Sequence, residues 1–84
     1  MVLWTIFVLP TEEQDIKEVV IDSEKTFGEF RRIVSSMINV NSNDLIFVGA
    51  QEYNYNFNSK KLKDISGIYD QVTLYAGYQV GGGK

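Results

Sequence analysis

The sequence predicts an α+β roll in which one helix packs across a mixed sheet of four or five strands. Two apolar, β-branched segments open the chain, one segment with helical periodicity follows, and shorter apolar segments return in the second half. This order is typical of a sheet with one face covered by a helix. With 84 residues, of which 44% are apolar, the chain supplies one small core, so we expect one domain over residues 1–80 and a flexible tail over 81–84.

The first two strands are expected at residues 2–9 and 16–21, where apolar, β-branched and aromatic residues dominate. Pro10 through Asp15 supply turn and charged residues between them. We interpret the pair as an opening hairpin. Its connection of about six residues is too long for a tight turn, so the register is not fixed by the sequence.

The helix is expected to begin after Thr26 and to end by Asn39. Thr26 and Glu29 have the spacing of a capping box, in which the hydroxyl and the carboxylate each accept a hydrogen bond from the other residue's backbone N–H. Gly28 lowers helix propensity by about 1 kcal/mol relative to alanine, and the sequence offers no reason for it. Arg31 falls outside the apolar stripe. That stripe, with spacings of three and four, is predicted to be core and comprises Phe27, Phe30, Val34 and Met37.

The second half of the chain predicts three more strands. They are expected at residues 45–48, 52–55 and 72–75, with Gly49 permitting a sharp turn between the first two. Leu45 and Leu62 are expected to be buried. The last strand is expected beside the first, which would complete the sheet.

Composition excludes several classes of function. The chain has no cysteine and no histidine, so a thiolate nucleophile, the commonest general base and the commonest zinc ligands are missing. We therefore expect neither an enzyme nor a cofactor or metal site. The net charge of −3 argues against nucleic-acid binding, and the longest apolar run, residues 2–9, is too short to cross a membrane. The lack of cysteine fits a cytoplasmic protein, with the nucleus as an alternative location.

The end of the chain is a run of glycines, Gly81 to Gly83, followed by Lys84. Glycines lose more backbone freedom on ordering than other residues and have no side chain to bury. Such a segment is thin enough to enter a narrow cleft of an enzyme. It is equally explained, from composition alone, as an unstructured end.

Short strings along nearly the whole chain resemble ubiquitin in order and in spacing. They are Ile6–Val8, Thr26 at the helix start, Leu45–Gln51, Leu62 with Asp64, and Thr73–Leu74. Counting forward from Thr73 and Leu74, Gly82 and Gly83 fall on the two terminal glycines of ubiquitin without a gap. The resemblance implies a ubiquitin-like β-grasp fold in a diverged member of that family.

The chain departs from ubiquitin at positions that matter for conjugation. Gln79 stands where ubiquitin has an arginine that its activating enzyme reads, so charging by that enzyme is in question. The two most used chain-forming lysines of ubiquitin correspond to Ala50 and about Asp70, so the usual chains are not expected.

The resemblance also implies a protein-binding patch on the sheet. Its central isoleucine corresponds to Ile46, for which plain sheet packing is the alternative role. A flanking valine is replaced by Gly77, which makes the patch smaller at that corner. Leu9 and Tyr75 stand where ubiquitin has a lysine and a histidine, and they are expected to restore apolar area.

Three functions follow from the resemblance. In the first, the chain is a protein modifier: a protease removes Lys84, an activating enzyme adenylates the Gly83 carboxylate, and conjugating enzymes pass it through a thioester to form an isopeptide bond with a lysine of a target protein. In the second, it is a non-conjugated interaction domain that binds partners around Ile46. In the third, it is a sulfur carrier with a thiocarboxylate at Gly83. We expect a monomer in each case.

Overall fold

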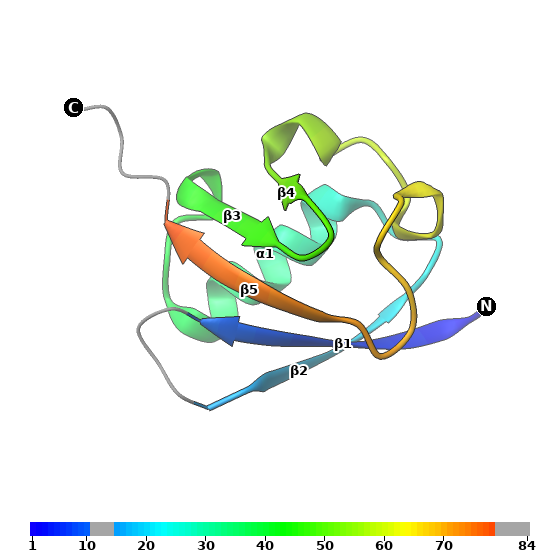
Figure 1. Cartoon of the computed structure of the whole chain (residues 1–84), viewed down its shortest axis with the longest axis horizontal. Coiled ribbons are helices and arrows are strands. Elements are labelled where there is room, and N and C mark those ends of the chain that lie inside the picture. The colour runs from blue at the N-terminus through cyan, green and yellow to red at the C-terminus, as the bar shows by residue number, and fades with distance from the viewer. Residues whose placement is uncertain (11–14, 79–84) are drawn as a thin grey trace.

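A computed structural model of the chain describes residues 1–10 and 15–78, with the side chain of Tyr78 excepted. Five strands form one sheet in the order β2-β1-β5-β3-β4, and helix α1 crosses one face of it (Figure 1). Strand β5 is parallel to β1 and antiparallel to β3, so the sheet is mixed. The predicted α+β roll is confirmed, including the last strand beside the first.

The strands differ from the predicted ranges mainly at their ends. The second strand of the β3–β4 hairpin stops early, because the Asn54 side-chain oxygen accepts a hydrogen bond from the Asn56 N–H at 2.9 Å and starts a short 3₁₀ helix. The last strand continues to Tyr78 because β1 and β3 flank it on both sides. The strands are β1 Leu3–Pro10, β2 Lys17–Asp22, β3 Leu45–Val48, β4 Glu52–Tyr53 and β5 Thr73–Tyr78, the helix is α1 Phe27–Ile38, and the 3₁₀ helices are η1 Ser42–Asp44, η2 Tyr55–Phe57 and η3 Leu62–Asp64.

Helix α1 begins and ends where the sequence predicts. The Glu29 N–H donates to the Thr26 hydroxyl at 3.3 Å, and the Thr26 N–H donates to the Glu29 carboxylate at 3.3 Å, which confirms the capping box. Asn39 terminates the helix in the left-handed conformation, with φ of 61°. The structure also accounts for Gly28: its N–H donates to the Asn58 carbonyl oxygen, and a Cβ there would lie 3.1 Å from that oxygen.

The core lies between α1 and the inner face of the sheet. Phe27, Phe30 and Val34 are fully buried there, as is Leu45 of β3. The prediction for Met37 is wrong, because its side chain is 43% exposed. The stripe continues through Ile38, which packs against the core in its place.

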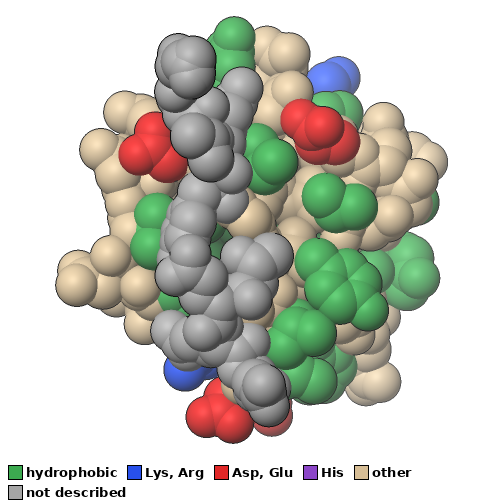
Figure 2. All heavy atoms as spheres, turned by 60° about the vertical axis from the view of Figure 1, so that its left-hand side comes forward, with side chains coloured by type: hydrophobic (Ala, Val, Ile, Leu, Met, Phe, Trp, Pro, Cys, Tyr) green, Lys and Arg blue, Asp and Glu red, His purple; other side chains and the backbone are tan. Residues whose placement is uncertain are grey.

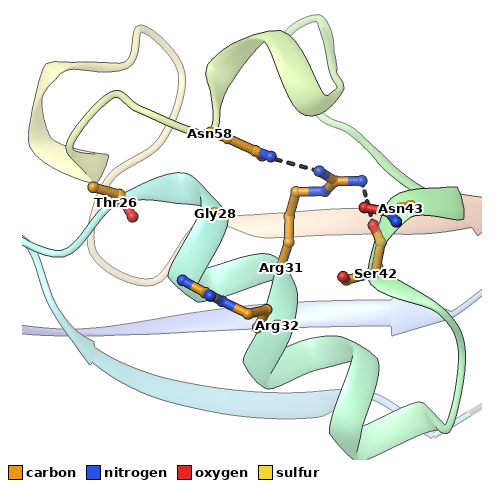
Figure 3. Close-up of a pocket in the computed structure, with 7 residues that line it drawn as sticks. All are labelled: Thr26, Gly28, Arg31, Arg32, Ser42, Asn43 and Asn58. Carbon is orange, nitrogen blue, oxygen red and sulfur yellow. Dashed lines mark hydrogen bonds between the residues drawn. The ribbon is translucent and has the colours of Figure 1, made fainter.

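Arg31 is buried although it interrupts the apolar face of α1, and it is only 2% exposed. Its guanidinium donates to the Asn58 side-chain oxygen at 2.9 Å and to the Ser42 carbonyl oxygen (Figure 3). It also donates to the Leu45 carbonyl oxygen at 2.9 Å. These bonds join α1 to η1, to the start of β3 and to the loop after η2. The sequence analysis placed Arg31 outside the stripe because the residue is charged, although its spacing, four residues after Phe27 and three before Val34, puts it on the core face.

Candidate protein-binding surface

The three residues predicted for the binding patch lie together on the sheet face opposite α1. Alternation along the strands decides this: Leu9, Ile46 and Tyr75 each stand between two buried neighbours whose side chains point to the core. Leu9 of β1 lies opposite Tyr75 of β5, and Ile46 of β3 lies opposite Gly77 of β5. Central strand β5 therefore brings together residues that are far apart in the sequence.

Val48 belongs to the same surface and was missed by the sequence reasoning. It lies opposite Tyr75 on β3, so Leu9, Tyr75 and Val48 form a row across three strands. Tyr75 is 54% exposed and Val48 is 44% exposed, whereas Leu9 and Ile46 are half-buried. The period of two that places Ile46 outward also places Val48 outward, so the signal was present in the sequence. We call Leu9, Ile46, Val48 and Tyr75 the outer patch.

The outer patch has the character of a contact surface. Figure 2 shows a group of exposed hydrophobic side chains on the right-hand side of the view. Gly77 leaves bare backbone beside Ile46, which is the smaller corner that the sequence predicted. An exposed group of apolar side chains on one sheet face is typical of a site where another protein binds.

Acidic residues flank the outer patch on both sides. Glu52 of β4 extends the row, since it lies opposite Val48, and Glu18 of β2 lies opposite Phe7, the half-buried aromatic residue beside the patch on β1. Both glutamates are exposed. These two carboxylates favour a partner that carries basic residues around an apolar centre.

The residues predicted to act in conjugation lie outside the part of the chain that the structure describes. They are Gln79, Gly82, Gly83 and Lys84, together with the predicted tail over residues 81–84. Within the described ranges, no helix has the length and hydrophobicity needed to span a bilayer. Nor do three or more histidine, cysteine or acidic side chains of these ranges come together as a metal site would require.

Comparison with known proteins identifies the fold. No protein-family model and no curated protein matches the sequence. Among solved structures, a de novo designed protein based on ubiquitin is 18% identical with a TM-score of 0.76, over 98% of this chain and 95% of its own. The ubiquitin of Caldiarchaeum subterraneum is 17% identical with a TM-score of 0.75, over 95% of this chain and 99% of its own.

These similarities establish the fold. The chain has the ubiquitin-like β-grasp fold, as its resemblance to ubiquitin predicted. At such identities the likeness concerns the fold, so the function is argued from the residues of this chain.

Proposed function

We propose that the chain is a ubiquitin-like protein modifier, joined through its Gly83 carboxylate to amines of target proteins after removal of Lys84. The observation that carries the proposal is the register of the C-terminal segment. Thr73 and Leu74 begin β5, the central strand, and the distance in sequence from them to Gly82 and Gly83 equals that in ubiquitin.

In this proposal the chemistry belongs to partner enzymes. The Gly83 carboxylate attacks the α-phosphate of ATP and releases pyrophosphate, an enzyme thiolate then displaces AMP, and a target lysine amine finally displaces the thiol to form the isopeptide bond. The chain contributes an unhindered carboxylate, since Gly82 and Gly83 have no side chains to obstruct a narrow channel. Gln79 is the position at which an activating enzyme would distinguish this tail from that of ubiquitin.

The outer patch is proposed as the surface on which these enzymes, or readers of the conjugate, bind. Leu9 and Tyr75 supply apolar area where ubiquitin has basic and titratable side chains. With Glu18 and Glu52 at the margins, the surface suits a partner whose apolar contact residues are bordered by lysine or arginine. Ubiquitin's own partners would then bind weakly, which agrees with the change at Gln79.

An extract assay tests the conjugation step. The full chain, labelled at its N-terminus, is incubated with ATP in an extract of its native cells, and labelled bands of higher mass that survive a reducing agent are counted as conjugates. Gly83→Phe should abolish these bands while the far-UV circular dichroism spectrum is unchanged, whereas Gly81→Ala, outside the glycine pair, should retain them. Conjugates formed by Gly83→Phe would exclude the modifier function.

The same assay tests the outer patch with two matched tyrosines. Tyr75 and Tyr69 are 54% and 57% exposed, but Tyr69 lies in the loop before β5. Tyr75→Ser should reduce the amount of conjugate several-fold, and Tyr69→Ser should leave it unchanged. An equal effect of both substitutions would mean that the outer patch has no special role.

A non-conjugated interaction domain is the second candidate, and the outer patch favours it because that surface is complete without the tail. The mass of the protein recovered from its native cells separates the candidates. A chain that ends at Gly83 supports the modifier, a chain that retains Lys84 supports the interaction domain, and a sulfur-for-oxygen mass increase at Gly83 would indicate a sulfur carrier.

A further inference from the structure

A cavity of about 310 Å³ lies on the helix side of the molecule, away from the outer patch. The N-terminal half of α1, η1 and the loop after η2 form its walls (Figure 3). Pockets for drug-sized ligands measure about 300–1,000 Å³. The size of this cavity therefore suits a small ligand such as an inorganic ion with its hydration shell, or a small ester.

The lining of this cavity is basic, although the chain as a whole is acidic. The chain has only two arginines, Arg31 and Arg32, and both line the cavity, whereas no aspartate or glutamate of the described residues does. Arginine presents a planar fork of donors that fits oxyanions in a bidentate manner. In a protein of net charge −3, the concentration of both arginines here marks the cavity as a place for an anion.

Arg31 carries a buried positive charge that no carboxylate of the described residues neutralises. Neither arginine forms an ion pair with an acidic residue of the described ranges. A guanidinium has five N–H donors. The Arg31 donors that form hydrogen bonds all donate to uncharged oxygens, those of Asn58, Ser42 and Leu45. The Arg31 Nε is buried and has no hydrogen-bond partner in the described structure. Burial lowers the pKa of Arg31, because removal of the guanidinium from water disfavours its charged form. An anion in the adjoining cavity would offset this cost.

Other donors in the cavity come from side chains rather than from the start of α1. The amides of Phe27, Gly28 and Glu29 already donate to Lys60, Asn58 and Thr26, so they are not available to a ligand. The Asn58 side-chain oxygen accepts from Arg31, which leaves its amide nitrogen as a donor. Arg32 is exposed and Asn43 of η1 also lines the cavity, so the lining adds a second cation and a second amide to Arg31 and Asn58.

We propose that this cavity binds a phosphate-type dianion, either free inorganic phosphate or a phosphate monoester. Arg32 and the amides of Asn43 and Asn58 hold the oxygens, and the charge of Arg31 attracts the ligand from behind. This site is independent of the proposed modifier function, because it uses neither the tail nor the outer patch.

Titration of the full ¹⁵N-labelled chain with potassium phosphate tests the site, with potassium chloride at equal ionic strength as the reference. Phosphate should produce saturable shifts in the backbone amides of Gly28, Asn43 and Asn58 that chloride does not produce. O-phosphoserine in a second titration separates the two sources, because a monoester site will bind it at least as tightly as inorganic phosphate.

Arg32→Gln is the informative variant, since its exposed side chain makes no protein hydrogen bond in the described structure and its loss should leave the fold intact. It should weaken phosphate binding by at least about tenfold, the value of one lost charge-assisted hydrogen bond. Lys60→Gln removes the same charge from an exposed residue that does not line the cavity, and should leave affinity within about twofold. Equal weakening by both variants, or shifts with phosphate no larger than with chloride, would overturn the proposal.

Discussion

Replacement of Arg31 by methionine should destabilise the fold by about 2 kcal/mol, even though it removes a costly buried charge. Methionine keeps the aliphatic part of the side chain and its packing but removes the guanidinium donor from the oxygens of Leu45 and Asn58, and it leaves the Ser42 oxygen with the Leu45 N–H alone. A fully buried acceptor without a partner costs about 1–3 kcal/mol, and this applies to Leu45. The other two oxygens are partly buried and regain water, so each adds a smaller cost of about 0.5–1 kcal/mol.

The gross cost is thus about 2–5 kcal/mol, and relief of the desolvated guanidinium offsets part of it. Against a total stability of about 4–13 kcal/mol for a domain of this length, the loss should be readily measured. Urea unfolding measures this loss of stability. The fluorescence of Trp4 reports the transition, because Trp4 is the only tryptophan and packs against the core.

Arg32→Met is the matched control for this experiment. Arg32 is the next residue on α1 and of the same type, but it is exposed and its side chain makes no protein hydrogen bond within the described ranges. Its replacement should change stability by no more than about 0.5 kcal/mol. If the two variants unfold at the same urea concentration, the bonds of Arg31 do not stabilise the junction of α1, η1 and β3, and the reasoning is refuted.

Three further perturbations follow from the same structure. Phe30→Ala should cost about 3–5 kcal/mol in urea unfolding because the ring is fully buried, whereas Met37→Ala, at a 43% exposed side chain, should cost under about 1 kcal/mol; similar values would reject the core assignment. Gly67→Ala should lower the melting temperature by several degrees, because Gly67 has φ of 90° and a Cβ there would overlap the Tyr53 hydroxyl; an unchanged melting temperature would contradict this. Hydrogen bonds from Lys63 and Lys61 hold the pKa of Glu24 below its usual 4.5, so its stabilising contribution is present above pH 4.5 and disappears as the pH falls through the lowered value. The stability of Glu24→Gln should therefore fall less between pH 5 and pH 3 than that of the parent chain, and equal slopes would count against the assignment.

Local sequence signals were sufficient for most of the fold. The capping box of Thr26 and Glu29 and the end of the helix at Asn39 depend on residues close together in the chain, and both were predicted correctly. The strands were found because their apolar residues lie in continuous runs. Their ends were predicted less accurately, because the length of β5 depends on its pairing with β1 and β3 rather than on its own residues.

The errors arise where contacts between distant segments decide the outcome. Arg31 and Met37 exchange the roles predicted for them, because carbonyl groups of η1 and β3 accept hydrogen bonds from the one, and no element of the described part of the chain covers the other. The cavity beside Arg31 likewise joins segments that are separated in sequence. Gly28 is explained only by Asn58, thirty residues later. None of these relations leaves a local pattern in the chain.

The strand pairing of β3 with β4 adds detail to the outer patch that the sequence alone did not give. Alternation alone would have included Val48, but only the pairing of Val48 with Glu52 shows that the apolar row ends in a carboxylate. A partner that fits this row must carry its positive charge beyond β3, at the β4 edge of the sheet. The sequence could not supply this constraint, because the hairpin from β3 to β4 contains an irregular turn whose register is set by Gly49 and Gln51.

The central position of β5 connects the outer patch to the proposed conjugation site. Hydrogen bonding to β1 and β3 fixes the backbone of β5 up to Tyr78, including Gly77 beside Ile46. Gly83 follows Tyr78 by five residues, so its carboxylate lies at most about 18 Å from the end of the strand even when fully extended. An enzyme bound on the outer patch can therefore place its active site only within this radius. Insertion of three residues between Val80 and Gly81 should then impair charging with the glycine pair intact, whereas unimpaired charging would mean that the tail is recognised without the patch.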